Sequence, residues 1–592
     1  MKRKIISAIL CVAMALEMVS CTSIKKSSEK NQDFEEFCQE IFIDNLKNDA
    51  FTAHFQIADV SKYGIEYHKD DYNLGECNLD YIHGEYEKIS DMLDKLRKFD
   101  RDSLSEEQKI TYDTLEDYFE TNAMYSGLEL YQNMFGISQG LVSNLSTNFV
   151  EFVFYDKEDV DEYLCCLMDV SRYVDDALGF LEKQSEEGLF MPVKVAEQVI
   201  DQCNKYINAK EEPLLITFEN KISQLDGLSD EEKDQYIRTN EEYVDKYYKP
   251  VYKNIKNKLE ELKDTSKNQG GLCGFGEDGK KYYQAIVRDK TSTDISPDEL
   301  IDYLDDAMSD LIKELNSIVL SDVDAYYDFM DYQADVNDPS EVLEYVLDNM
   351  NDDFMAPVTD EYSIEYQLPV CEVDGVLAYY VSSRIDDISI NNIKVNSSAV
   401  ADDTTTLYTT MAHEGFPGHL YQFTSMYAND NICDVRKTLD FIGVTEGWAE
   451  YASDIAMDYL TDCSDNVKRL IQINDMISYI VGSRLDLGVN YEGWDYEDAY
   501  DYLSDYYAVD NDFDNEDNTV VELYTQAAGD PGVYLPYTVG HLMMDDLKEQ
   551  AQDELGKKFD LKSFNTWIIG EMGITSFDVY SDNLDDWIKS QK

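Results

Sequence analysis

The stretch Ser296-Pro297-Asp298-Glu299-Leu300 opens the segment whose pattern decides the fold class. Ser296 is a favoured N-cap residue, and Pro297 suits the first position of a helix. Apolar residues then recur at steps of three and four, at Leu300, Leu304, Met308, Leu311 and Leu315. This spacing places them on one face of a helix, so we expect that face to pack against a core.

The same periodicity runs through most of the chain and predicts a mostly α-helical protein. It is found in residues 34–48, 86–98, 105–131, 158–184, 193–223, 230–264, 340–351, 466–486, 496–507 and 537–554. Strand-like sequence is confined mainly to residues 363–397, where apolar residues partly alternate and Ile393-Lys394-Val395 forms a short run. We therefore expect a large helical body with a small β element, which directly precedes the histidine-rich segment described below.

Length, composition and charge narrow the class of protein. The 592 residues are 43% hydrophobic and include 45 tyrosines, which is too rich in burying side chains for a disordered chain. Lys and Arg number 49 against 122 Asp and Glu, so the formal net charge is -73 at pH 7. So negative a surface repels phosphate backbones, and we exclude nucleic acid as a partner.

Residues 1–20 have the pattern of a secretory signal. Basic residues at positions 2–4 precede an apolar run from Ile5 to Leu16, which is too short to span a membrane. The residues before Cys21 resemble a bacterial lipoprotein signal, in which Cys21 becomes the lipidated first residue of the mature chain. The alternative is an ordinary cleaved signal in which Cys21 is incidental.

The lipoprotein interpretation sets the expected organisation and address of the chain. Residues 21–32 are polar and suit a flexible tether, and residues 33–592 are expected to form one large helical domain. Two lobes around a cleft are the open alternative within that domain. We expect the protein to be held at the cell membrane by lipid alone, facing the outside or the periplasm, with no transmembrane helix after the signal.

The stretch Met411-Ala412-His413-Glu414-Gly415-Phe416-Pro417-Gly418-His419 contains two of the six histidines of the chain. Zinc binds neutral imidazoles, and a Glu beside a ligand can accept a proton from water as a general base. The two histidines stand six residues apart, which is about 240° around a regular helix at ~100° per residue. A straight helix would therefore point them in different directions.

Pro417 and Gly418 interrupt a regular helix between the two histidines. We expect a kinked or bulged helix that brings the imidazole nitrogens of His413 and His419 within roughly 4 Å of each other. The alternative is a helix that ends at Phe416 and leaves His419 binding nothing.

A second stretch, Thr445-Glu446-Gly447-Trp448-Ala449-Glu450-Tyr451, supplies two carboxylates. Glu446 and Glu450 are four residues apart and share a helical face in a stretch that is otherwise apolar or small. A zinc ion held by two histidines and one Glu, with the second Glu orienting a ligand imidazole, would satisfy all four groups. The alternative is a pair of surface acids on a very acidic protein.

At these residues the sequence resembles the bacterial domain-of-unknown-function 885 family, which is marked by H-E-x-x-P-G-H and a later E-G-W-A. The resemblance covers essentially the whole mature chain, including Gly188-Leu189-Phe190-Met191-Pro192 and Pro536-Tyr537-Thr538-Val539-Gly540. It implies a gluzincin-type zinc metallopeptidase, secreted or lipoprotein-like.

The resemblance also implies roles for individual residues. One zinc ion would be held by His413, His419 and Glu446, with Glu414 as the general base and Glu450 beside a ligand imidazole. The chain departs from the family at two positions, because many members have His where this chain has Asn490 and Asn565. These departures bear on substrate specificity rather than on metal binding.

A zinc hydrolase also needs a donor for the developing oxyanion. Tyr537 and His541 are four apart on a predicted helix, and either is a candidate; the alternative is a core Tyr and a surface His. Residues 393–396 are a candidate edge strand that pairs with an extended peptide. Arg384 and Arg484 are rare positive charges near these motifs, suited either to a peptide carboxylate or to structural ion pairs.

Together these features predict a zinc-dependent hydrolase, a peptidase that acts on extracellular peptides through activated water with Glu414 as general base. The competing interpretation is a catalytically inactive, lipid-anchored surface protein that binds peptides or sugars. The set of His413, Glu414, His419 and Glu446 distinguishes the two, because a binding protein has no need to keep all four.

Overall fold

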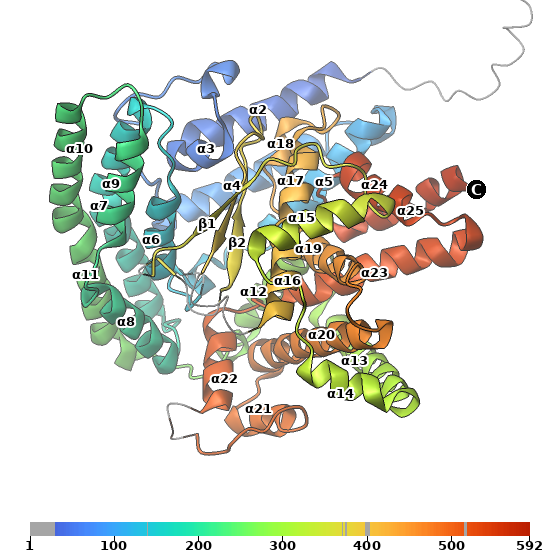
Figure 1. The fold of residues 1–592 in the computed structure, drawn as a ribbon. Helices are drawn as coiled ribbons and strands as arrows, with labels where there is room; N and C mark the ends of the chain where they lie inside the picture. The colour runs from blue at the N-terminus through green and yellow to red at the C-terminus, as the bar shows by residue number, and fades with distance from the viewer. Residues whose placement is uncertain are drawn as a thin grey trace, which may run out of the picture.

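Helices make up most of the chain, and one small sheet lies among them (Figure 1). The structure is a computed structural model, and it describes residues 30–138, 140–369, 371–372, 376–396, 403–513, 515 and 518–592. The mostly helical fold expected from the sequence is confirmed, and the sheet lies in the interval predicted for it. Cys21 and the signal lie outside the described residues.

The N-terminal helices pack around their own apolar core. They are α2 (Gln32–Asn48), α3 (Ala50–Gln56), α4 (Leu79–Leu96) and α5 (Glu106–Ala123), whereas α6 (Leu141–Glu151) packs into the core of the next bundle. The first of them begins at Gln32 because the Asn31 side chain accepts a hydrogen bond from the Phe34 N–H. Helix therefore starts at the last residue of the tether that the sequence suggested.

A second bundle of helices lies to the left of the sheet in Figure 1. It comprises α7 (Lys157–Glu187), α8 (Val193–Ile207), α9 (Pro213–Gln224), α10 (Asp230–Tyr243) and α11 (Lys249–Leu262). The single helix expected over residues 193–223 is wrong, because the chain breaks at 208–212 and restarts with Pro213 in the first turn of α9. Proline lacks an N–H and fits the first turn of a helix but not its interior.

The next helices lead from the bundle to the sheet. They are α12 (Glu277–Thr291), α13 (Pro297–Ser321), α14 (Val323–Asp331) and α15 (Pro339–Asn349). Helix α13 begins as expected, with the Ser296 side chain accepting from the Glu299 N–H. Leu300, Leu304 and Met308 are buried, whereas the face becomes half-exposed beyond them.

The sheet has three short strands, β1 (Ser363–Tyr366), β2 (Ala378–Val381) and β3 (Asn392–Val395), in the order β1-β3-β2. Strand β3 runs parallel to β1 and antiparallel to β2, with Tyr380 opposite Ile393. The expectation that residues 393–396 form an edge strand is therefore wrong. Ile393 and Val395 are fully buried, so the short apolar run marks the centre of the sheet, and β2 is one of its edges.

Most of the remaining helices pack on the largest apolar core, whereas α21 and α22 pack on a separate one. The remaining helices are α16 (Thr404–Glu414), α17 (His419–Tyr427), α18 (Asp434–Lys437), α19 (Ile442–Met457), α20 (Asp465–Leu487), α21 (Tyr496–Leu503), α22 (Thr519–Gly529), α23 (Leu535–Leu555), α24 (Leu561–Thr566) and α25 (Phe577–Gln591). Helices α19 and α23 touch through their backbones, because a Cβ at Gly540 would lie 1.9 Å from the Gly443 carbonyl oxygen. This close crossing brings the start of α23 beside the carboxylates of α19.

Two further features of the described chain concern its thiols and its relation to membranes. The nine cysteines that the structure describes are free thiols, and five of them are buried. Among the described helices, none combines the length and the apolar content that a membrane span requires.

Candidate metal centre

The two histidines of the first motif lie on separate helices. Helix α16 ends at Glu414, and α17 begins at His419 after a four-residue loop. The loop is tight because the Gly418 N–H donates to the Ala412 carbonyl oxygen at 3.1 Å. A Cβ at Gly418 would lie 1.8 Å from the His413 carbonyl oxygen, so no other residue fits there. The structure thus has two helices and a loop where one kinked helix was expected.

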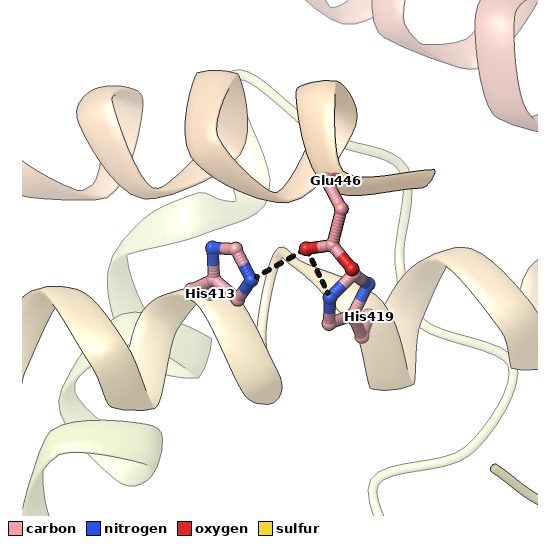
Figure 2. Close-up of side chains that lie close together, drawn as sticks. All are labelled: His413, His419 and Glu446. Atoms are coloured by element: carbon pink, nitrogen blue, oxygen red, sulfur yellow. Dashed lines mark ion pairs between the residues drawn. The ribbon is translucent and has the colours of Figure 1, made fainter. Parts of the chain in front are cut away.

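Both imidazoles nevertheless face the same carboxylate oxygen. The Nε2 atom of His413 lies 3.3 Å from Glu446 Oε2, and Nε2 of His419 lies 3.4 Å from that oxygen. Figure 2 shows Glu446 reaching down from its own helix, α19, to the two rings. The three candidate ligand atoms all lie within 4.8 Å of one another. Ending the helix before His419 therefore does not separate the rings.

The other nitrogen of each ring is also held. Nδ1 of His413 lies 3.3 Å from Glu450 Oε1, which accepts a second hydrogen bond from the Tyr479 hydroxyl at 3.1 Å. Nδ1 of His419 lies 3.4 Å from the side-chain oxygen of buried Gln422. An acceptor at Nδ1 fixes the tautomer and directs the Nε2 lone pair inward, as is usual for metal-binding histidines.

The donor set fits zinc. Two imidazole nitrogens and one carboxylate oxygen are ligands that zinc prefers, and three protein ligands leave one coordination position for substrate or water. The observed separations of 3.3 and 3.4 Å match the edge of a tetrahedron with metal–ligand bonds of ~2.0–2.1 Å, which is about 3.3 Å. His413, His419 and Glu446 would therefore hold the ion.

The buried charges are tightly coupled when no ion lies between them. Burial opposes the charged form of His413, but Glu446 and Glu450 outweigh it and raise its pKa well above the ordinary value. Burial likewise opposes ionisation of Glu446, but His419 and His413 outweigh it and hold the pKa of that carboxyl well below its usual range. The imidazole and carboxylate groups of the cluster therefore offset the cost of one another's burial.

Glu414 lies beside the donor set without belonging to it. Its Oε2 accepts a hydrogen bond of 2.8 Å from the Tyr380 N–H on β2, and its Oε1 is 3.9 Å from His413 Nε2. Burial raises the pKa of Glu414, which makes the carboxylate a better proton acceptor near neutral pH. The sheet thus positions the residue that the sequence suggested as a base.

These residues line one cavity of about 860 Å³, and Tyr537 and His541 lie in its wall. The Tyr537 ring stacks on His413 with centroids 6.4 Å apart. Nε2 of His541 lies 3.4 Å from Asp454 Oδ2 and 3.7 Å from Asp545 Oδ2, and burial lowers the pKa of this imidazole. Both predicted donors reach the cavity, but His541 is already engaged by carboxylates.

Four other residues singled out in the sequence lie outside the cavity lining. Asn490 and Asn565 are fully buried and bond to neighbouring groups, Asn490 to the Leu272 N–H and Asn565 to the Tyr451 hydroxyl. Arg484 pairs with Asp305 and Glu492, and Arg384 pairs with Asp387. The two asparagines and the two arginines therefore have structural partners.

Three groups at the site were not found from the sequence: Gln422, Tyr479 and the backbone N–H of Tyr380. Gln422 carries a usable signal, because it stands three residues after His419 and shares its helical face. Tyr479 lies on α20 and Tyr380 on β2, and no local pattern links either to the histidines. Only the packing of distant segments brings them to the cavity.

The family follows from a match over most of the chain. Residues 59–574 match the family described as "Bacterial protein of unknown function (DUF885)". The chain belongs to the DUF885 family. The resemblance drawn from the histidine and glutamate motifs is confirmed, and the DUF885 match includes every residue of the candidate metal centre.

Solved structures share this DUF885 fold. A protein from Colwellia psychrerythraea, described as "the putative lipoprotein", is 17% identical with a TM-score of 0.81, over 94% of this chain and 99% of that one. A "putative lipoprotein of unknown function" from Shewanella oneidensis is 15% identical with a TM-score of 0.63, over 93% and 99%. At these identities the likeness establishes the fold alone. No curated protein matches the chain.

Proposed function

We propose that this DUF885 protein is a zinc-dependent hydrolase that cleaves peptides outside the cytoplasm. The observation that carries the proposal is the convergence of His413, His419 and Glu446 on one point at the wall of a cavity of about 860 Å³. Glu414, the proposed base, lies beside these three residues and is not one of the proposed ligands. Most structural zinc sites are closed by four protein ligands, whereas this one offers three, borders a cavity and has a base beside it, as catalytic zinc sites do.

The chain's own residues divide the chemistry among them. A bound zinc ion would supply a Lewis acid that polarises a carbonyl and makes water acidic near neutral pH. Glu414 accepts the proton of the attacking water through Oε1, since its Oε2 is held by the Tyr380 N–H. It then passes that proton to the leaving amine.

Tyr537 is the better donor for the developing oxyanion. Its ring stacks on both His413 and Tyr479, which fixes its orientation in the cavity wall. Among the residues that the structure describes, none forms a hydrogen bond with its hydroxyl. Nε2 of His541 faces Asp454 and Asp545 instead. We therefore assign the donor role to Tyr537.

The edge of the sheet favours an extended peptide as substrate. Strand β2 is an edge strand, and Val376, Leu377, Ala378, Tyr379 and Tyr380 line the cavity. The Tyr380 N–H points to Glu414 and so away from β3. Because backbone groups alternate along a strand, the N–H and C=O of Ala378 point to the same open edge, where a substrate backbone can pair with them.

The proposal is tested by separating the base from the ligands. Glu414→Gln keeps the shape of the side chain and removes the proton acceptor, so peptide hydrolysis should fall by ~100- to 10,000-fold while bound zinc stays nearly unchanged. Glu446→Ala should lose zinc and activity together. Exposed Glu549 on α23 provides a control, since Glu549→Gln should alter neither.

The measurements are zinc per chain by mass spectrometry and cleavage of a fluorogenic peptide library. Full activity in Glu414→Gln, or a parent chain that binds no divalent metal, would reject the hydrolase. A parent chain that binds zinc and peptide but never cleaves would support the binding-protein alternative instead.

We also propose that the chain is attached to the membrane by lipid at Cys21. The signal pattern before Cys21 supports this, as does the description of the Colwellia and Shewanella proteins as lipoproteins. The substrates would then be peptides at the outer face of the membrane or in the periplasm.

A further inference from the structure

A second group of metal-type side chains lies where α3 meets α7, away from the first centre. It consists of His54 in the last turn of α3 and of Asp159 and Glu162 near the start of α7. One ligand atom from each lies within 4.8 Å of the others. His54 Nδ1 is 3.5 Å from Asp159 Oδ1 and 4.0 Å from Glu162 Oε2. These separations exceed those of ordinary hydrogen bonds and leave room for an ion between the groups.

The cluster contains a buried carboxylate that lacks a partner. The side chain of Glu162 is 9% exposed and that of His54 is 6% exposed. Within the described part of the chain, no group forms a hydrogen bond with Glu162 Oε1 or with His54 Nε2. Burying a carboxylate costs several kcal/mol unless a cation or a hydrogen-bond donor compensates it, so an orphaned carboxylate in a native core calls for one.

The donor atoms are held in place by contacts outside the cluster. The His54 ring stacks on Phe152 with centroids 3.7 Å apart and planes 9° from parallel. Asp159 Oδ2 accepts hydrogen bonds from the N–H groups of Tyr155 and Asp156, at 2.7 and 2.9 Å. Its Oδ1 is thereby turned toward His54. Such fixed orientation by surrounding contacts is what a metal site needs.

The charge of Arg384 acts on the cluster but forms no ion pair with its carboxylates. The Arg384 guanidinium lies 3.8 Å from the centroid of the Tyr155 ring and pairs with Asp387 at 3.7 Å. Among the residues that the structure describes, no Lys or Arg forms an ion pair with Asp159 or Glu162. Burial raises the pKa of Glu162 to about 8 and that of Asp159 to about 6, as expected of carboxylates that lack a close cation.

We propose that His54, Asp159 and Glu162 bind a second divalent cation. One imidazole and two carboxylates suit Zn²⁺, which takes nitrogen and oxygen ligands in this combination. Among the described residues no base stands beside these donors, and the cluster lines none of the larger cavities. Although this site also has three protein ligands, an ion held there meets no substrate, so we assign it to the packing of α3 on α7 rather than to catalysis.

The position of the cluster gives this ion a mechanical role. It joins α3 to α7, and the end of α3 in turn holds the loop that follows β2. The Ile385 N–H donates to the Gln56 carbonyl oxygen at 2.9 Å, and Asp386 accepts from the Ala58 N–H. The second ion therefore supports the segment that continues from the cavity's edge strand.

This site is tested by counting the zinc bound to a variant that lacks the first centre. The variant His413→Ala/His419→Ala removes the first centre, and after removal of metal and incubation with Zn²⁺ it should retain one zinc per full-length chain. Adding Glu162→Gln to this background should reduce that to none. Glu158→Gln is the matched control, because Glu158 is exposed one turn before Glu162 on α7 and its side chain, among the described residues, bonds only the Tyr72 hydroxyl.

Thermal unfolding provides a second readout. Zn²⁺ should raise the melting temperature of the His413→Ala/His419→Ala chain, by an amount that grows with free zinc, and should not do so once Glu162→Gln is added. His54→Gln is a second variant with the same expected loss, in case the first is poorly folded by circular dichroism. Absence of zinc from the double-alanine background, or retention of zinc by a folded Glu162→Gln or His54→Gln chain, would overturn the proposal. Neither result bears on the first centre, which is tested separately by the loss of zinc in Glu446→Ala.

Discussion

The indole N–H of Trp448 donates a hydrogen bond of 3.0 Å to the carbonyl oxygen of Pro417. Pro417 lies in the loop between the two histidine helices, and Trp448 lies two residues after Glu446 on α19. Both the indole and the loop are fully buried. One hydrogen bond thus joins the segment that spaces the imidazoles to the helix that supplies the carboxylate.

Trp448→Phe should weaken both the fold and the metal centre. The substitution leaves the buried Pro417 carbonyl oxygen without its donor, which costs about 1–3 kcal/mol in the free energy of unfolding, with a further loss from the smaller ring. Trp567→Phe is the control, because Trp567 is also buried but its indole forms no hydrogen bond to the described residues. Urea unfolding and zinc titration compare the two. Equal zinc affinity in both variants would show that this link does not shape the centre.

Glu450→Ala should lower zinc affinity by ~10- to 100-fold, because it removes the acceptor that orients His413 through Nδ1. Glu450→Gln retains an oxygen at the same distance and should recover most of the affinity. Competition with a chromogenic chelator measures both. Unchanged affinity in Glu450→Ala would mean that Tyr537 and the surrounding core hold the ring without this carboxylate.

Tyr537→Phe should reduce kcat by ~100- to 1,000-fold while zinc content stays constant, because it removes one donor to the oxyanion and keeps the ring that stacks on His413. Tyr534→Phe, one turn earlier, lies outside the cavity lining and should leave kcat unchanged. Steady-state kinetics on a cleaved peptide provide the measurement. If His541→Gln lowers kcat more than Tyr537→Phe does, the donor role belongs to the imidazole instead.

Cys21→Ala should release the protein from membranes or leave it unprocessed, since the thiol is the proposed attachment point for lipid. Fractionation of cells into membrane and soluble parts, with intact mass of the mature chain, checks this. Cys38 lies close by in sequence, but its side chain projects from α2 into the N-terminal core. Cys38→Ala should therefore keep the protein at the membrane. Parent protein found unprocessed and soluble would contradict the anchor.

Much of the helical fold could be predicted from local sequence. The cap at Ser296 and the apolar spacing after it mark the start of α13, because both depend on residues within a few turns of each other. Where tertiary packing competes with periodicity, the prediction fails. The pattern of residues 193–223 predicts one amphipathic helix, although Pro213 starts a second one. Residues 393–396 are predicted to form an edge strand, although β3 lies between β1 and β2 in the sheet.

The sequence by itself determined which side chains are present for chemistry: two histidines around a Pro-Gly pair, one Glu beside the first, and two more glutamates four apart. It did not determine whether His419 faces His413, because a helix that stops before His419 is compatible with either arrangement. Tertiary structure decided this. The close approach of Gly418 to His413 and the bond from Trp448 to Pro417 fold the loop back so that both Nε2 atoms meet Glu446. Tertiary structure also decided the surroundings of His54. Asp159 and Glu162 lie more than a hundred residues away in the sequence and become its neighbours only when α3 packs on α7.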